Sequence, residues 1–275
     1  MYLSKTGSKG KRILINVVLG ILSLVWIFPV IFLIIGSMKT KTEYNMTNFW
    51  QLAQRINWKE NFEYIVKYSQ IFHSVFNSLL YSLFGTVGAI ILAVLAAYGL
   101  TKLSIKHKMF WFMVIYSGTI FPFQMYLIPV FKAYMKLNLY DTQIGLVVFY
   151  IAICIPFSMF VFRNHFMSIP DDVIEASKID GAGKIKTLTD ILLPMSKASL
   201  SVVFLTQFSW CYNELMFGIT FTKSDSIKPV MAALSTFSNN KPAMMVACII
   251  VSVPTIILYI LLNKNFNDGI AYQTK

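Results

Sequence analysis

Six long apolar stretches divide the sequence, and they restrict the possible folds more than any other feature does. They are 20 to 27 residues long and cover Ile13–Met38, Ser74–Leu100, Met109–Phe131, Gln143–Phe162, Ala198–Phe221 and Ala243–Leu262. A helix needs about 20 apolar residues to cross the hydrocarbon core of a bilayer, which is about 30 Å thick. We therefore predict an all-α polytopic membrane protein with six transmembrane helices, built as a single transmembrane domain over residues 1–275.

The composition supports a membrane protein and argues against two other classes. Hydrophobic residues make up 56% of the chain and charged residues 13%, whereas an average soluble domain has about 25% charged residues. The net charge of +12 could suggest nucleic acid binding. The basic residues are, however, spread between the apolar stretches without forming a block, so we expect no nucleic acid partner and attribute the charge to loops at a lipid membrane.

Cysteines and histidines give no support for a metal site or a catalytic centre. The three cysteines (Cys154, Cys211 and Cys248) and the three histidines (His73, His107 and His165) are scattered along the chain. Their spacing matches neither a zinc site nor a Cys/His nucleophile pair. We therefore expect no bound metal and no enzymatic activity.

The distribution of basic residues predicts the orientation of the chain in the membrane. If the N-terminus is cytoplasmic, the cytoplasmic segments hold 14 of the 24 Lys and Arg residues and the outer segments hold 10. Cytoplasmic loops normally carry this excess, and the basic flank of the first helix usually dominates. That first helix is followed by no small-residue cleavage site, so we expect it to be retained. We predict a multi-pass membrane protein with both termini in the cytoplasm.

Polar residues inside the fifth stretch are candidates for a substrate pathway. Gln207 lies ten residues beyond Lys197, about 15 Å into the membrane at 1.5 Å per helical residue. Tyr212, Asn213 and Glu214 follow one to two turns later. Acidic residues inside membranes often mark transport pathways, although Glu214 could instead extend to the membrane surface.

Prolines in or near the apolar stretches indicate bent helices. The five are Pro29, Pro122, Pro129, Pro156 and Pro254. Each removes a backbone hydrogen bond and can kink a helix, which lipid tolerates only where neighbouring groups bond the freed carbonyl. Any one of them could be an ordinary proline of a membrane helix. Together they suggest helices bent around a cavity.

The loop at about residues 163–197 differs from the other loops because it holds five of the twelve acidic residues. It is typical of two short helices outside the membrane. Ser168 and Asp171 provide the start signal of the first helix, which runs to about Ile179, and the segment Asp180–Gly183 breaks it. The second helix is expected to place Ile185, Leu188, Ile191 and Leu192 on one face, and Pro194 marks the start of the fifth membrane helix. The pair could bind a partner or rest on the bilayer surface.

The residues of this loop resemble the EAA loop of ABC-importer permeases. The pattern is Glu175-Ala176-Ser177, then Asp180-Gly181-Ala182, then Ile191, Leu193 and Pro194. Two positions depart from the family pattern: Ser177 replaces an alanine, and Leu188 stands where an aromatic residue is frequent. Both changes preserve small size or apolar character.

Other segments are similar to the carbohydrate-uptake branch of the same family, in particular the smaller permease subunit of maltose and multiple-sugar importers. They are Ser37-Met38-Lys39, Asn77-Ser78, Ala96–Lys102, Tyr212-Asn213-Glu214, and Pro254 with Phe266 and Gly269. This resemblance covers nearly the whole chain. It implies an ABC type I importer permease with six helices and cytoplasmic termini.

The resemblance also implies a function and partners. The first loop helix would couple the chain to a cytoplasmic ATPase, with Glu175 paired to a basic residue and the small residues allowing close approach. The partners implied are a second homologous permease, two ATPase subunits that bind ATP and Mg²⁺, and an extracytoplasmic solute-binding protein. That protein would contact the outer loop at about residues 39–73 or the segment 222–241. This chain itself would bind no cofactor.

The solute is less closely specified than the transport class. A sugar or oligosaccharide is the expectation from the resemblance, and another solute such as a polyamine or a phosphonate is the first alternative. A polytopic membrane enzyme or an assembly factor is the second alternative. The sequence contains no recognisable catalytic set in support of it.

Overall fold

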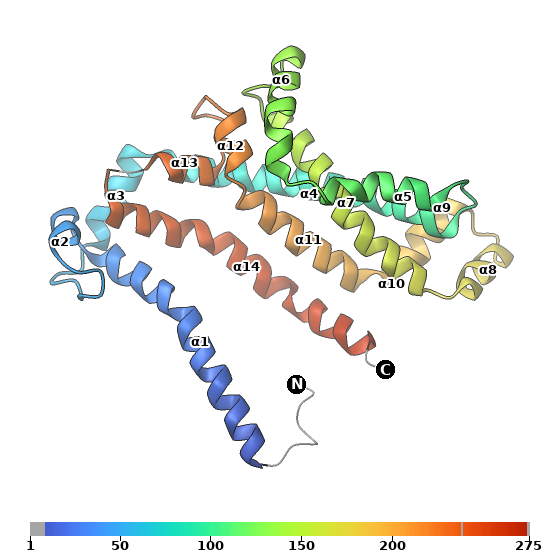
Figure 1. The fold of residues 1–275 in the computed structure, drawn as a ribbon, viewed down its shortest axis with the longest axis horizontal. Helices are drawn as coiled ribbons and strands as arrows, with labels where there is room; N and C mark the ends of the chain where they lie inside the picture. Colours follow the sequence, from blue (N-terminus) through green and yellow to red (C-terminus); the bar gives the residue numbers. More distant parts are fainter. Residues whose placement is uncertain (1–8, 238, 274–275) are drawn as a thin grey trace. The chain divides into compact units, whose positions relative to one another are not determined.

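The computed structural model describes residues 9–237 and 239–273, and no strand occurs among them (Figure 1). The helical elements are α1 (Lys9–Met38), α2 (Lys41–Met46), α3 (Trp58–Tyr68), α4 (Ile71–Lys102), α5 (Lys108–Tyr116), η1 (Ser117–Thr119), η2 (Phe123–Tyr126), α6 (Leu127–Leu137), α7 (Gln143–Ser168), α8 (Asp171–Ile179), α9 (Lys184–Lys186), η3 (Thr187–Leu192), α10 (Leu193–Met195), α11 (Lys197–Tyr212), α12 (Met216–Phe221), α13 (Val230–Thr236) and α14 (Lys241–Gln273). The prediction of an all-α protein is therefore confirmed.

Within the described residues, four helices are long and apolar enough to cross a membrane: α1, α4, α7 and α14. Two bent pairs raise the number to six if each pair is counted as one span. The first pair joins 108–119 to 123–137 at an angle of 91°, and the second joins 184–195 to 197–212 at 79°. The predicted apolar stretches thus correspond to four continuous helices and two interrupted ones.

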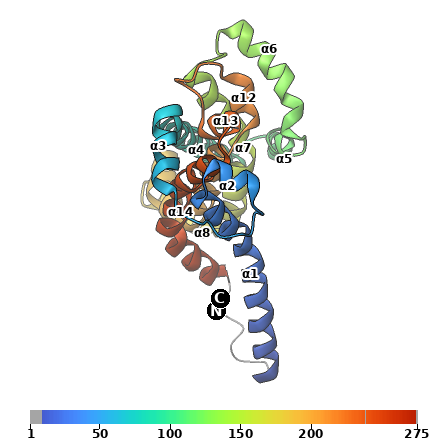
Figure 2. The same ribbon diagram turned by 90° about the vertical axis from the view of Figure 1, so that its left-hand side faces the viewer.

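Two of the predicted stretches are not the single helices that their hydropathy suggests. The third, Met109–Phe131, is interrupted at residues 120–122, so that α5 and α6 run in different directions (Figure 2). The fifth, Ala198–Phe221, ends as a helix at Tyr212, and α12 begins separately at Met216. The first interruption consists of Ile120, Phe121 and Pro122, which are all apolar, so hydropathy alone does not reveal it. The second contains Asn213 and Glu214, which lie within a largely apolar stretch.

The chain divides into two compact units, one of residues 1–69 with 237–250 and the other of residues 70–236 with 251–275. In the second unit, α4 packs along α7 (Figure 1). Gly85 and Gly88 of α4 permit this close contact. A Cβ atom at Gly85 would lie 2.7 Å from the Cβ of Tyr150, and one at Gly88 would lie 2.7 Å from the Cδ1 of Ile151. Small residues at such interfaces let two membrane helices approach closely.

The second unit holds two clusters of buried side chains. The first, here called the loop cluster, joins α4 and α7 to the 163–197 loop and to α11. Its members are Ile90, Ala93, Val94, Ala97, Tyr98, Leu100, Met159, Phe162, Phe166, Ile169, Ile174, Leu188, Leu192 and Val203. The other cluster packs α4, α7, α11 and α12 with Tyr134 of α6.

In the first unit, α1 exposes its apolar side chains over most of its length, as expected for a span surrounded by lipid. The outer loop predicted at residues 39–73 begins as a folded cap at the end of this helix. The side chain of Lys39 is fully buried, and its Nζ donates hydrogen bonds to Thr47 Oγ1 and to the carbonyl of Asn48, both at 2.9 Å. Asn61 of α3 donates to the carbonyls of Ser37 and Lys39 at 3.0 Å.

Candidate functional site

The 163–197 loop begins later than the sequence predicts. Helix α7 continues past Phe162 to Ser168, whose hydroxyl donates to the carbonyl of His165 at 2.7 Å. Ser168 is therefore the end of α7, and the prediction that it starts the next helix is wrong. Pro170, whose ring restricts its φ, directly precedes α8. Asp171 and Asp172 occupy the first turn of α8, where acidic side chains are favoured by the helix dipole.

The turn after α8 explains the glycine of the motif. The amide of Ala182 donates to the carbonyl of Ser177 at 2.9 Å, and the amide of Gly181 donates to the carbonyl of Lys178 at 3.0 Å. These two bonds form a Schellman motif, which requires a left-handed residue directly after the helix cap. Gly181 has φ +75°, a conformation that costs glycine no steric strain. No other atom lies within 4 Å of a Cβ placed there, so the position is open to a partner.

Ser177 joins the two helical arms of the loop, of which the first is α8 and the second consists of α9, η3 and α10. Its side chain is buried, and its hydroxyl lies 3.2 Å from Thr187 Oγ1 and donates to the carbonyl of Ile174 at 2.7 Å. The family pattern has alanine at this position, which cannot form such a bond. The serine therefore adds a polar contact between α8 and the second arm.

The second arm attaches the loop to the membrane domain through fewer residues than expected. Leu188 and Leu192 are buried in the loop cluster, together with Ile174 of α8. Ile191 is half-buried, whereas Ile185 is 79% exposed. The expectation for Ile185 is wrong because it lies in the first turn of the arm between Lys184 and Lys186, which are also exposed.

Lys102, at the end of α4, holds the start of α8. Its buried ammonium donates to Asp171 Oδ1 and to the carbonyl of Ile169, both at 2.7 Å. The hydrogen bond from Lys102, together with its charge, lowers the pKa of Asp171 below its ordinary value. A bond between a charged donor and a charged acceptor is stronger than a neutral one. No sequence pattern predicts this role for Lys102, although the segment Ala96–Lys102 is similar to the family.

The outward side of α8 is available for contact with another protein. Glu175, Ala176 and Asp180 are exposed in this chain, and Ile179 is 87% exposed. Of the later motif residues, Leu193 and Ala182 are half-buried and Pro194 is exposed. A surface with two acidic side chains, one small and one large apolar side chain suits a groove that combines a basic and an apolar region.

The predicted pathway residues have different surroundings. Tyr212 is buried, and its hydroxyl donates to the carbonyl of Val251 at 3.1 Å. Asn213 is exposed, and its amide donates back to the carbonyl of Ser209 at 2.8 Å. Neither side chain lines a described cavity. The sequence did not indicate these local partners.

Glu214 caps the short helix α12. It is 6% exposed, and its carboxyl oxygens accept hydrogen bonds from the amides of Phe217 and Gly218 at 3.0 to 3.1 Å. The hydroxyl of Tyr150 lies 3.5 Å from Oε2. These amides begin α12 and have no carbonyl partner within it. Glu214 therefore does not extend to the membrane surface, because its oxygens are bound inside the protein.

Gln207 is the predicted pathway residue that lines a cleft. The cleft has a volume of about 420 Å³ and is bounded by residues 118–123, Ile153, Phe157, Gln207 and Trp210. We call it the span-break cleft because residues 118–123 contain the interruption between α5 and α6. Gln207 is half-buried there.

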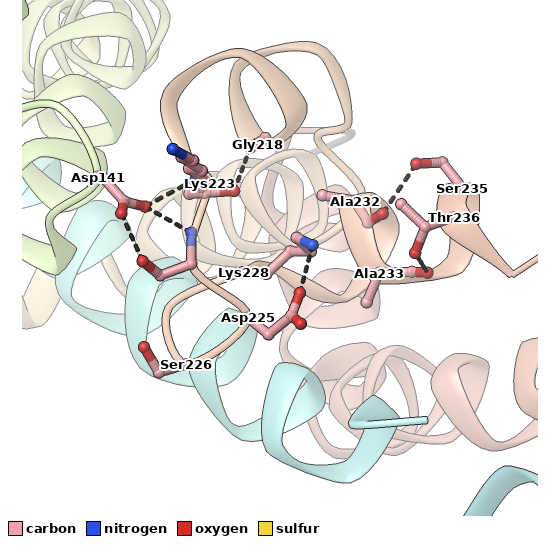
Figure 3. Close-up of polar contacts among 12 residues, drawn as sticks. Asp141, Gly218, Lys223, Asp225, Ser226, Lys228, Ala232, Ala233, Ser235 and Thr236 are labelled. Atoms are coloured by element: carbon pink, nitrogen blue, oxygen red, sulfur yellow. Dashed lines mark hydrogen bonds and ion pairs between the residues drawn. The ribbon is translucent and has the colours of Figure 1, made fainter. Parts of the chain in front are cut away.

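The segment between α12 and α13 is held in place by Asp141, a residue that the sequence did not single out. Its carboxylate accepts from the amides of Lys223 and Ser224 at 2.7 and 2.9 Å, and from the hydroxyl of Ser224 at 2.6 Å (Figure 3). Burial acts to raise the pKa of Asp141, but these hydrogen bonds outweigh it and the pKa is lowered. Asp225 and Lys228 form an ion pair in the same segment.

The start of α4 holds the other side of this segment. Asn77 donates to the carbonyl of Ser226 at 2.9 Å, and Ser78 Oγ accepts from the amide of Val230 at 2.8 Å. The Asn77-Ser78 pair, which the sequence showed only as a resemblance, thus has a structural role. Among the residues that the structure describes, no three His, Cys, Asp or Glu side chains are grouped so that they could hold a metal ion.

Comparison with known proteins identifies a family model and relatives that match most of the chain. The model described as "binding-protein-dependent transport system inner membrane component" matches residues 89–272. The xylose/arabinose import permease protein XacI of Haloferax volcanii is 32% identical over 227 residues, which are 73% of each chain. The sn-glycerol-3-phosphate transport system permease protein UgpE of Yersinia pestis is 28% identical over 205 residues, which are 72% of each chain.

Two solved structures share the fold. A chain of a bacterial ABC transporter involved in the import of the acidic polysaccharide alginate superposes with a TM-score of 0.80 at 22% identity, covering 96% of this chain and 100% of the other. A chain of the bacterial alginate ABC transporter in complex with an alginate pentasaccharide-bound periplasmic protein gives a TM-score of 0.65 at 15% identity, covering 92% and 94%. At these identities the likeness concerns the fold alone.

Proposed function

The chain belongs to the family of binding-protein-dependent transport system inner membrane components, and on this premise we propose that it imports a sugar or oligosaccharide as one permease subunit of an ATP-driven transporter. Membership makes it a membrane-embedded transport subunit rather than an enzyme, as the sequence resemblance implied. The named relatives carry xylose and arabinose or sn-glycerol 3-phosphate, and these names support a sugar or a sugar-like solute.

The observation that carries the proposal is the construction of the 163–197 loop. The loop presents Glu175 and Ile179 to solvent, while Leu188 and Leu192 are buried against α4 and α7. One side is thus open to a partner, and the other side is fixed in the membrane domain. In the proposed mechanism, an ATPase subunit holds the exposed side of α8, with a basic residue paired to Glu175.

Movement of the ATPase would then be transmitted as a rigid-body movement of the 163–197 loop. The Schellman turn at Gly181 and the contact between Ser177 and Thr187 hold the two arms together. Lys102 ties the start of α8 to α4. A force applied to α8 is therefore passed to the membrane helices, which would rock between inward-open and outward-open arrangements.

The remaining parts of the transporter follow from the same proposal. A second homologous permease would complete the channel, and two ATPase subunits would bind ATP and Mg²⁺, so that this chain binds no cofactor. Both termini and the 163–197 loop would face the cytoplasm of a bacterial cell. The solute-binding protein would dock on the opposite side, where Asp141 orders the segment 222–229.

The coupling role is tested by Gly181→Asp. A side chain at this position meets no atom of the chain within 4 Å, so its steric cost is confined to the left-handed conformation, about 1 to 2 kcal/mol. We expect normal amounts of the permease in the membrane, loss of the co-purified ATPase, and uptake reduced to background. Normal uptake by this variant would contradict the proposal.

Two matched variants separate docking from backbone strain. Gly183→Asp adds the same charge two residues away, at φ −73° and again with no neighbour within 4 Å, and we expect it to retain most of the uptake. Gly181→Asn adds a side chain of the same size without charge, and asparagine adopts the left-handed conformation readily. We expect it to lose less uptake than Gly181→Asp.

A further inference from the structure

The span-break cleft lies at a depth where membrane proteins rarely expose irregular backbone. Gly118 and Gln207 are each ten residues beyond a lysine, Lys108 and Lys197 respectively, which places both about 15 Å along their spans. Non-helical backbone at such a depth is tolerated where it lines a water-filled cavity or is buried in protein. Interrupted membrane helices also form the substrate sites of many transporters.

The local sequence builds the opening between the broken span and the helices α7 and α11. Pro122 has no amide hydrogen and fixes its own φ, which interrupts the helix. Gly118 allows α7 to approach the break, since a Cβ atom at Gly118 would lie 3.0 Å from the Cγ of Pro156. Phe157 of α7 and Trp210 of α11 supply aromatic walls.

Two side chains of the cleft are suited to binding a ligand. Gln207 makes no hydrogen bond with any residue that the structure describes, so its amide donor and acceptor groups are both free for a ligand or for water. Trp210 is held edge-on by Phe123 and Tyr150, with ring centroids 6.0 and 6.4 Å away. Its ring is therefore a fixed platform, which lowers the entropy cost of stacking against it.

From this arrangement we infer that the span-break cleft binds an uncharged sugar ring of the transported solute. The inference rests on the proposed function and narrows its substrate. One face of a sugar ring consists of C–H groups and packs on an aromatic ring, and its hydroxyls bond to an amide. A volume of about 420 Å³ lies within the range of about 300 to 1,000 Å³ for small-molecule sites.

The absence of charge in the cleft decides between classes of solute. None of its lining residues, which all belong to the described part of the chain, is acidic or basic. A polyamine, a phosphonate or a sugar acid would have to give up its hydration without an opposite charge to replace it, which is costly. A lipid tail would leave the Gln207 amide unbonded. An uncharged sugar meets neither penalty.

The test uses the complete transporter in proteoliposomes, with its binding protein and ATPases. Uptake is measured for radiolabelled xylose and maltose as neutral sugars, and for glycerol 3-phosphate and spermidine as charged solutes. We expect the wild-type complex to take up a neutral sugar in preference to both charged solutes. Gln207→Leu and Trp210→Ala are expected to lower that uptake about tenfold, which corresponds to about 1.4 kcal/mol, whereas Trp210→Phe should keep most of it because stacking remains.

Controls distinguish a substrate contact from a folding defect. Gln124→Leu makes the same substitution at an exposed residue of η2 outside the cleft, and we expect unchanged uptake. In all variants, assembly and ATP hydrolysis stimulated by the binding protein should stay within about twofold of wild type, since no residue that lines the cleft belongs to the 163–197 loop.

Two results would overturn the inference. The first is full uptake by both Gln207→Leu and Trp210→Ala, and the second is a wild-type complex that prefers a charged solute. Either result leaves ATP-driven import intact, whereas failure of the proposed function would appear as normal uptake in Gly181→Asp. The two failures are therefore distinguishable.

Discussion

Replacing Glu214 tests whether its carboxyl group holds α12 in place. In Glu214→Ala, the amides of Phe217 and Gly218 lose their acceptor. Both amides belong to buried residues, so water cannot readily replace the lost oxygen atoms. The neighbouring Tyr150 also loses its contact with Oε2.

The magnitude follows from the number of amides left without a partner. Each buried polar group that loses its hydrogen bond costs about 1 to 3 kcal/mol, so two amides give about 2 to 6 kcal/mol of lost unfolding free energy. Glu214→Gln keeps one carbonyl oxygen as an acceptor, and its amide group can donate to the hydroxyl of Tyr150. We therefore expect a cost of about 1 kcal/mol for glutamine, near the value for one ordinary hydrogen bond.

Two measurements on the purified permease in detergent check this order. Unfolding by titration with dodecyl sulfate should rank the free energies as wild type, then Glu214→Gln, then Glu214→Ala. Amide hydrogen exchange of a peptide covering residues 213–221 should speed up most in the alanine variant. Asn213→Ala is the control, because its exposed side chain bonds only to its own helix. Wild-type stability and exchange in Glu214→Ala would refute the capping role.

Two further predictions concern contacts between elements. Lys102→Met removes the bonds to Asp171 and Ile169, so limited proteolysis of the 163–197 loop should accelerate severalfold. Because Lys102 lowers the pKa of Asp171, the ion pair is complete above the ordinary aspartate pKa of about 3.9 and is lost as the pH falls through the lowered pKa. The protection of the wild-type loop from proteolysis should therefore be constant from about pH 8 to 5 and weaken only at lower pH. The Sγ atoms of Cys154 and Cys211 lie 3.5 Å apart, so a membrane-permeant oxidant should give a disulfide between them in peptide mass spectra, and peptides linked instead through Cys248 would contradict this placement of α7 against α11.

Local chemistry explains which parts of the loop are predictable from the sequence. The turn at Gly181 depends on hydrogen bonds between residues three and five positions apart and on the conformational freedom of glycine, so the sequence suffices to place it. The start of α8 depends on how far α7 continues, and that is set by the burial of Phe166 and Ile169 in the loop cluster. Burial of this kind is a property of the packed chain, which is why Ser168 was wrongly predicted as a cap.

The span-break cleft shows the corresponding limit for the membrane helices. Hydropathy registers that residues 109–131 are apolar, but it does not register that the helix is interrupted at residues 120–122, where Pro122 lies. The sequence predicted Gln207 as a pathway residue from its depth alone, and its surroundings, including Trp210 and the broken span, come from three separate segments of the chain. The hydrogen-bond donors to Glu214 could not be predicted from the sequence either, because they are backbone amides, which every residue except proline has.

The two proposed sites are linked by the helices that they share. Helix α7 carries Phe166 in the loop cluster and Phe157 in the cleft, nine residues or about 14 Å apart, and α11 similarly carries Val203 in the loop cluster and Gln207 in the cleft. A displacement of the loop that moves either helix must therefore change the spacing between Phe157, Gln207 and the broken span. Because the span is already interrupted at residues 120–122, its two halves can follow different neighbours without breaking further helical hydrogen bonds. The interruption thus offers a physical reason why force at the coupling loop would alter the affinity of the cleft for a sugar.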